Sequence, residues 1–164
     1  MKKITVCPHC GLGYGQYANP VPTTDVVIYT HGHSVVVIEH QPHGFALPGG
    51  FIDKDEQAED TVVREMREET GLDVELIGLL GVYSHPLRDP RQHTLSVVFI
   101  GRPRNLGQLR AGDDAKSAAF YLLDRLPAPL VFDHAQILRD FQDVLTGKRY
   151  PASVERKHPA ESQL

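Results

Sequence analysis

The segment from Glu56 to Gly71 constrains the fold more than any other part of this 164-residue chain. Its apolar residues recur with the period of an α-helix, and most of the other positions are charged. Gly71 follows where a helix commonly ends, because glycine adopts the left-handed conformation at little steric cost. The pattern predicts an amphipathic helix over residues 56–70 with one face packed on a core.

Runs of β-branched residues on both sides of this helix predict strands. Residues 26–29 and 34–39 are predicted to form a hairpin, and further elements are expected as strands at 74–83, 94–100 and 118–123 and a helix at 133–146. Strands and helices mixed in one short chain indicate the α/β class. We expect an irregular N-terminal arm over residues 1–20, one domain over 21–150 and a flexible tail over 151–164.

Charge and hydropathy exclude several classes of protein. The chain has 17 basic and 21 acidic residues, a formal net charge of −4, which argues against a nucleic-acid partner. No apolar run approaches the roughly 20 residues of a membrane-spanning helix, and the N-terminus lacks the apolar core of a signal peptide. We therefore expect a cytoplasmic protein that contacts no membrane.

Three carboxylates are concentrated near the end of the predicted helix. Glu65, Glu68 and Glu69 are spaced i, i+3 and i+4, so they project from one face. Like charges there repel one another, and the helix dipole disfavours them at a C-terminus. One interpretation is a solvated acidic surface. The other is a site for Mg²⁺ or Mn²⁺, cations that prefer hard oxygen ligands and keep waters for sharing with phosphate groups.

The spacing around these carboxylates resembles a known family signature. Gly50, Glu56 and the run from Arg64 to Leu72 match G-x5-E-x7-R-E-U-x-E-E-x-G-U, the Nudix box, over residues 50–72. The similarity extends from about residue 19 to the final helix. It implies an α/β/α sandwich with a mixed sheet between helices, and a metal-dependent hydrolase for nucleoside diphosphate derivatives. Family habit also implies a homodimer.

The resemblance implies a role for each residue of the motif. Glu65 and Glu69 match the principal metal ligands, Glu68 a further ligand or water-orienting group, and the Gly49 carbonyl a backbone ligand. Arg64 matches the arginine that fixes these glutamates by ion pairing. Glu56 matches a carboxylate that supports this cluster.

A second segment bears on the substrate. Residues 83–93, YSHPLRDPRQH, are similar to a Y-S-x-P-x-R-D-P-R-G-H segment of the ADP-ribose pyrophosphatase-like branch. Pro86 and this segment imply cleavage of ADP-ribose to AMP and ribose 5-phosphate. Arg88 and Arg91 are candidates for binding phosphate or ribose oxygens, or alternatively for pairing with Asp residues within the loop. The alternatives are NADH, an oxidised nucleoside triphosphate, or a nucleotide sensor without catalysis.

The chain departs from the family pattern at the position of the general base. Some ADP-ribose hydrolases carry a glutamate where this chain has Ser117. Either Asp113 or Asp114 then substitutes as the base, or Glu68 takes that role, or turnover is slow. Gln57 replaces a common helix-capping serine, and Asp133 is expected to cap the last helix.

The two cysteines form half of a zinc knuckle. Cys7 and Cys10 stand as C-P-H-C without a second cysteine pair, and two thiolates alone do not complete a zinc site. Histidines or a partner chain would have to supply the remaining ligands. We expect no bound zinc.

Overall fold

The computed structural model describes residues 2–17, 19–31, 33–40, 44–112 and 116–152. Its helices are α1 (Ala58–Thr70) and α2 (His134–Leu145), with a short 3₁₀ helix, η1 (Leu106–Gln108). Its strands are β1 (Lys2–Val6), β2 (Gly13–Tyr17), β3 (Val21–Ile28), β4 (Ser34–His40), β5 (Gly44–Ala46), β6 (Gly49–Phe51), β7 (Val74–Tyr83), β8 (Thr94–Pro103) and β9 (Ser117–Leu122). None of the described helices has the length and apolar character needed to cross a membrane.

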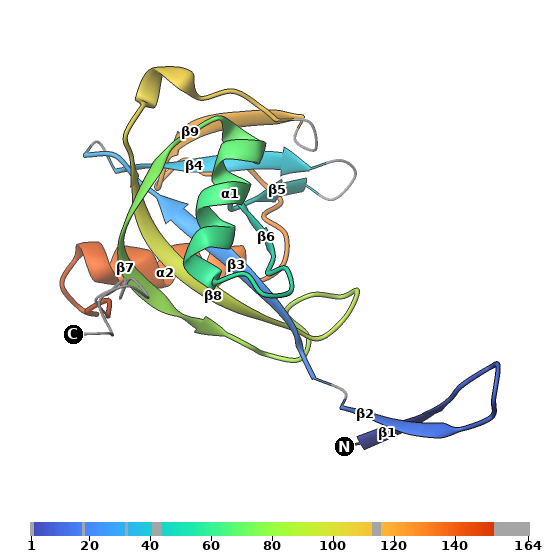
Figure 1. The fold of residues 1–164 in the computed structure, drawn as a ribbon. Coiled ribbons are helices and arrows are strands. Elements are labelled where there is room, and N and C mark those ends of the chain that lie inside the picture. Colours follow the sequence, from blue (N-terminus) through green and yellow to red (C-terminus); the bar gives the residue numbers. More distant parts are fainter. Residues whose placement is uncertain (1, 18, 32, 41–43, 113–115, 153–164) are drawn as a thin grey trace, which may run out of the picture.

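The strands form two sheets in the body of the molecule (Figure 1). One has the order β6-β3-β8-β7 and is mixed, because β3 runs parallel to β8 while β6 and β7 run antiparallel to their neighbours. The other has the order β5-β4-β9 and is antiparallel. The parallel pair places the start of β3 beside the start of β8, so the loops that enter these strands meet at one edge.

Alternating side chains along the central strands build two cores. Val26 and Ile28 of β3 pack with Val62 and Met66 of α1, whereas the intervening Val27 packs with residues of α2. Successive side chains of a strand point to opposite faces, so a strand buried on both faces is apolar throughout. The result is the α/β/α sandwich that the sequence predicted, with one helix on each side.

The helix α1 begins and ends as its sequence dictates. Gln57 occupies the N-cap position and makes no side-chain cap; the hydroxyl of Thr61 donates instead to Glu56 Oε2 over 2.7 Å. Gly71 ends the helix with φ 67° and donates its N–H to the Arg67 carbonyl over 3.1 Å.

Two local predictions are wrong. The predicted 26–39 hairpin does not form, because β3 and β4 belong to different sheets and are joined by an isolated bridge between Tyr29 and Val35. Both strands are buried on both faces, and each gains its hydrogen bonds from other neighbours. The N-terminal arm is also not irregular: β1 and β2 pair as a hairpin that extends away from the sheets (Figure 1).

The start of the predicted tail is paired with the domain. The backbone of Ala152 exchanges two hydrogen bonds with Leu79 of β7, at 2.8 and 3.0 Å. Residues 153–164 lie outside the described part of the chain.

The conformation at the end of α1 generates the first prediction. Gly71→Ala is expected to destabilise the protein by about 1–2 kcal/mol, because a Cβ is strained at positive φ. That Cβ would also stand 2.9 Å from the carbonyl of Gln108. The matched control is Gly107→Ala, since a Cβ at Gly107 meets no atom within 4 Å. Urea unfolding measures both variants, and equal losses in the two would contradict this explanation.

Candidate active site

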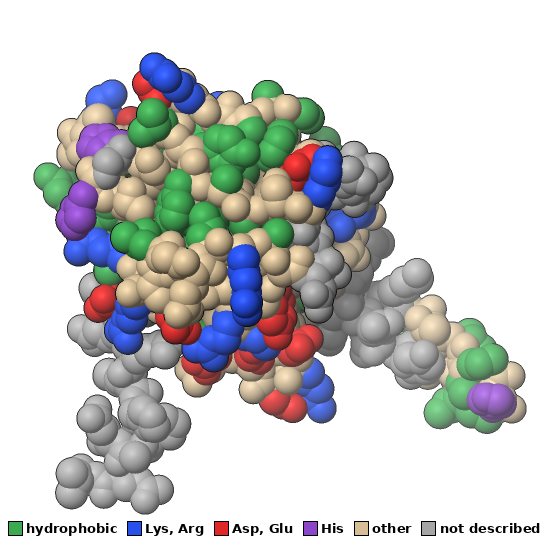
Figure 2. Space-filling view, turned by 90° about the horizontal axis from the view of Figure 1, so that it is seen from above, with side chains coloured by type: hydrophobic (Ala, Val, Ile, Leu, Met, Phe, Trp, Pro, Cys, Tyr) green, Lys and Arg blue, Asp and Glu red, His purple; other side chains and the backbone are tan. Residues whose placement is uncertain are grey.

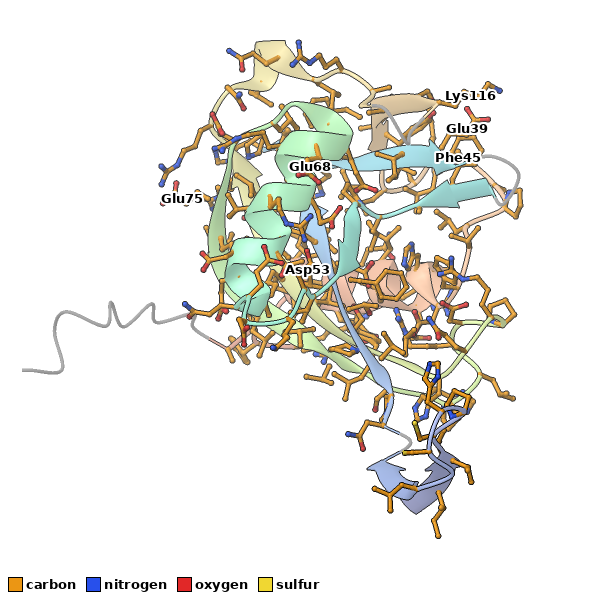
Figure 3. All side chains as sticks on the ribbon, turned by 45° about the vertical axis from the view of Figure 1, so that its right-hand side comes forward. Glu39, Phe45, Asp53, Glu68, Glu75 and Lys116 are labelled. Atoms are coloured by element: carbon orange, nitrogen blue, oxygen red, sulfur yellow. The ribbon has the colours of Figure 1, made fainter. Side chains whose placement is uncertain are left out.

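The predicted carboxylates of α1 line a cleft of about 700 Å³. The walls come from β3, β6, α1, the loop between β7 and β8, and the turn before α2. Figure 3 shows Glu68 and Asp53 on the side of α1 that faces β6, and Glu75 on the opposite side. In the face shown in Figure 2, acidic and basic side chains are intermixed along one edge. The volume suits a small-molecule ligand.

Two glycines bring the backbone of β6 against these carboxylates. The N–H of Gly49 donates to Glu69 Oε2 over 2.9 Å. Gly49 has φ 154°, and a Cβ there would overlap the carbonyl oxygen of Thr24. A Cβ on Gly50 would overlap the carboxylate of Glu65. A larger residue at Gly49 would therefore push β6 away from β3, and one at Gly50 would displace the carboxylate of Glu65.

Arg64 is the cation that organises this cluster. Its Nε and Nη2 form a fork on the two oxygens of Glu56, at 2.9 and 3.0 Å. Its Nη1 donates to Glu65 over 2.7 Å and to Glu68 over 3.2 Å. The hydrogen bonds from Arg64 and Thr61, against a smaller opposing effect of burial, lower the pKa of Glu56 to about 2. Arg64 thus pairs with three carboxylates at once, those of Glu56, Glu65 and Glu68.

The pKa of Glu65 shifts in the opposite direction, although Glu65 contacts the same arginine. Burial raises the pKa of its carboxyl, and the nearby charges of Glu69 and Glu68 add to the increase. Hydrogen bonding and attraction from Arg64 offset only part of this effect. The cluster consequently has more negative charge than one guanidinium neutralises, which favours the binding of an additional cation.

The chemistry of the donors fits Mg²⁺ or Mn²⁺. Glu65, Glu68, Glu69 and the Gly49 carbonyl supply only oxygen ligands, the type that these cations prefer. Glu68 is the most accessible of the three carboxylates, with 60% of its side chain exposed. Among the described residues, no group of three or more His, Cys, Asp or Glu side chains is already arranged around a cation position. Arg64 donates to two of the carboxylates in this arrangement.

The cysteines lie outside the cleft, in the hairpin of β1 and β2. Cys7 is half-buried, Cys10 is exposed, and neither forms a disulfide. Backbone N–H groups of His9 and Cys10, and the Cys10 thiol, lower the pKa of Cys7.

Arg88 lies at the centre of a buried network. Its side chain is 4% exposed, and it donates to both carboxylate oxygens of Asp133 at 3.0 and 2.7 Å. It also donates to Thr94 over 3.0 Å and contacts Asp25 at 3.4 Å. Arg88 therefore pairs with aspartates from outside its loop, and these ion pairs join the loop to β3 and to the start of α2. The expected capping by Asp133 is wrong: this residue takes the N-cap position of α2, but its carboxylate makes no cap hydrogen bond and binds Arg88 instead.

Arg91 is more accessible and lines the same cleft. Its guanidinium pairs with Asp89 at 2.8 Å, and its Cζ lies 5.1 Å from the ring centre of Phe132. Phe132 has a φ of 54° and is 37% exposed. A non-glycine residue in the left-handed region is strained, and such strain concentrates at functional sites.

The next residues to consider are the candidates for the general base and Ser117, which replaces the family's glutamate. Asp113 and Asp114 lie outside the described residues. The preceding Gly112 rests on the end of α1, where its N–H donates to the Glu69 carbonyl over 2.9 Å. The hydroxyl of Ser117 donates to Glu39 Oε2 over 3.1 Å.

Two buried site residues were not predicted as such. Asp25 stands directly before the apolar run Val26–Ile28 of β3, and a carboxylate at that place is the signal by which the sequence could have shown it. Burial acts to raise the pKa of Asp25, whereas the hydroxyl of Ser96 and the charge of Arg88 act to lower it. His134 begins α2 and is also buried. No periodicity or spacing distinguishes it from the other eight histidines.

Comparison with known proteins relates this geometry to a family. A model of the NUDIX domain matches residues 19–141. An ADP-ribose pyrophosphatase of Methanocaldococcus jannaschii is 45% identical over 132 residues, which cover 78% of this chain and 76% of that protein. The NAD-capped RNA hydrolase NudC of Pseudomonas aeruginosa is 28% identical over 93% of this chain, which spans 52% of that protein. A crystal structure of an ADP-ribose pyrophosphatase from Streptococcus suis is 25% identical, with a TM-score of 0.70 and coverage of 82% of this chain and 98% of that one.

The lowered pKa of Glu56 predicts how its contribution to stability depends on pH. Because the folded pKa of about 2 lies below the unfolded value, of about 4.3, the ionised form stabilises the fold. This contribution is fully present above the unfolded pKa and is lost as the pH falls through the folded pKa.

Comparison with Glu56→Gln isolates this contribution. The difference in the free energy of unfolding between wild type and Glu56→Gln should shrink when urea titrations are repeated from about pH 6 down to about pH 2.5. A difference that stays constant over this range would refute the assigned pKa.

Proposed function

This chain belongs to the NUDIX family of hydrolases, and from that premise we propose that it hydrolyses ADP-ribose to AMP and ribose 5-phosphate with Mg²⁺ or Mn²⁺. Water adds to one phosphorus of the pyrophosphate, and the bridging P–O bond breaks. The observation that carries the proposal is the set of three glutamates on α1, held against Gly49 and Gly50 within one cleft.

The substrate preference is supported by the other wall of the cleft and by the relatives. Arg91 offers a guanidinium to phosphate oxygens, and Phe132 offers an apolar ring to a base or a ribose. The relatives from Methanocaldococcus jannaschii and Streptococcus suis are named as ADP-ribose pyrophosphatases. Arg88 acts in this proposal through Asp133 and Asp25, because its donors are already engaged.

The residues of α1 divide the remaining tasks. Glu65, Glu68, Glu69 and the Gly49 carbonyl would hold the cation, which would neutralise pyrophosphate charge and lower the pKa of the attacking water. Arg64 keeps Glu65 oriented, and its fork on Glu56 keeps Arg64 itself in place. Glu68 is exposed enough to orient water or to accept its proton.

The proposed ligand role of Glu69 predicts a large loss of activity on substitution. Glu69→Gln should lower kcat on ADP-ribose by about 100- to 1,000-fold, because losing a charged ligand removes several kcal/mol of transition-state stabilisation. Glu75→Gln is the matched control, because Glu75 lies outside the cleft on the opposite side of α1. Release of the nucleoside monophosphate (AMP from ADP-ribose and NADH, the oxidised monophosphate from the triphosphate) is measured with a panel of ADP-ribose, NADH and an oxidised nucleoside triphosphate.

The panel separates the proposal from its alternatives. Selective turnover of NADH or of the oxidised nucleotide, abolished in Glu69→Gln, would keep the metal site and refute the assigned substrate. Binding of ADP-ribose without turnover of any panel member would indicate a nucleotide sensor. A loss in Glu75→Gln as large as in Glu69→Gln would refute the assigned cluster.

The base is identified by three separate substitutions. We expect Asp113→Asn or Asp114→Asn to lower kcat by about 100-fold or more, with little change in KM, if that residue accepts the proton. Glu68→Gln gives this loss instead if Glu68 does so. Unchanged kcat in both aspartate variants would exclude the segment after Gly112 as the source of the base.

A further inference from the structure

The loop before β6 is fixed at three successive residues. The N–H of Leu47 donates to Nδ1 of His134 over 2.8 Å. The carbonyl of Pro48 accepts a backbone N–H of β3 over 3.0 Å, and the N–H of Gly49 donates to Glu69. The Gly49 carbonyl, a proposed cation ligand, thus belongs to a segment whose position is set by hydrogen bonds on both sides.

His134 joins this loop to a distant part of the chain. It is the first residue of α2, 87 positions from Leu47, and it is 1% exposed where it borders the cleft. A ring nitrogen that accepts a backbone N–H carries a lone pair and no proton. The imidazole of His134 is therefore neutral, with its proton on Nε2.

The surroundings of Nε2 favour that tautomer. Nε2 lies 3.5 Å from Asp25 Oδ1, beyond an ordinary hydrogen bond, and has no hydrogen-bond partner among the described residues. Asp25 accepts a 2.5 Å hydrogen bond from Ser96 and contacts Arg88 at 3.4 Å. A carboxylate beyond Nε2 attracts the proton to that nitrogen, which leaves Nδ1 free to accept from Leu47.

We propose that His134 is a positioning residue for the cation site. Its neutral imidazole holds Leu47, and through the loop backbone the carbonyl of Gly49, at the distance from Glu69 that a cation needs. The inference rests on the proposed function, because it assumes that this carbonyl and the α1 carboxylates bind one cation. Residues that orient metal ligands commonly affect metal affinity or activity by about 10- to 100-fold.

Two substitutions of His134 test the roles of its two ring nitrogens separately. Asn places its side-chain oxygen where Nδ1 stands, so His134→Asn can still accept from Leu47. Gln reaches toward Asp25 in place of Nε2, so His134→Gln leaves the Leu47 N–H without an acceptor. Gln also matches the volume of His more closely, and a residue that merely fills space would therefore tolerate Gln better than Asn. Substitutions of His85 are the control, since its Nδ1 accepts from Leu87 over 3.2 Å in an exposed loop outside the cleft.

Two readouts do not require turnover. Hydrogen exchange of the Leu47 amide should remain slow in His134→Asn and become at least about 10-fold faster in His134→Gln. Titration of Mn²⁺, followed by the electron paramagnetic resonance of the free ion, should show affinity about 10- to 100-fold weaker in His134→Gln and nearly unchanged in His134→Asn. With ADP-ribose, kcat should follow the Mn²⁺ affinity at saturating substrate, while KM stays within about threefold of wild type.

Other results would contradict the proposed role of His134. Equal Mn²⁺ affinity in the two His134 variants, or tighter binding in His134→Gln, would overturn the proposal. If neither variant folds, the ¹⁵N shifts of the wild-type ring decide: a protonated Nδ1 would overturn it, and a protonated Nε2 with a bare Nδ1 supports it. If the wild type binds Mn²⁺ but does not cleave ADP-ribose, the proposed substrate fails while the ranking of variants by Mn²⁺ still tests His134.

Discussion

The site depends on the close approach of the Gly49–Gly50 backbone to the carboxylates of α1. Only glycine fits at Gly49, because a Cβ there would overlap the backbone of β3, and a Cβ on Gly50 would displace the carboxylate of Glu65. The approach allows the Gly49 N–H to donate to Glu69, so one hydrogen bond couples the sheet to the helix. Packing of α1 on β3 and β8 keeps that distance fixed, which makes the fold itself the support of the site.

The electrostatics of the cluster show that Arg64 stabilises the charge of Glu56 but does not offset the repulsion around Glu65. Arg64 touches Glu56 and Glu65, yet the pKa of Glu56 falls while that of Glu65 rises. The difference arises because Glu56 receives both arms of the fork, whereas for Glu65 burial and the charges of Glu69 and Glu68 outweigh its hydrogen bond from Arg64. The repulsion that remains is a cost in the free protein, and a bound cation would relieve it. Local repulsion thus supports cation binding.

Much of the fold could be predicted from the sequence, because its signals are local. The helix α1 and the strand β7 lie within two residues of their predicted bounds, since burial imposes a clear period on both. The hairpin over 26–39 failed because apolar runs buried on both faces do not specify their partners. The motif spacing predicted Glu65, Glu68 and Glu69 as neighbours. It could not predict that Arg88 joins Asp25 to Asp133, or that His134 meets Leu47, because those pairs span 45 to 87 residues.

The most direct test of the account is a crystal structure of the protein with Mn²⁺ and the α,β-methylene analogue of ADP-ribose, which cannot be cleaved at the bridging position. We predict anomalous Mn²⁺ density among Glu65, Glu69 and the Gly49 carbonyl, with the phosphonate oxygens bound to the same ion and Leu47 still bonded to His134. Mn²⁺ density away from these groups, or an analogue bound outside the cleft, would contradict the account.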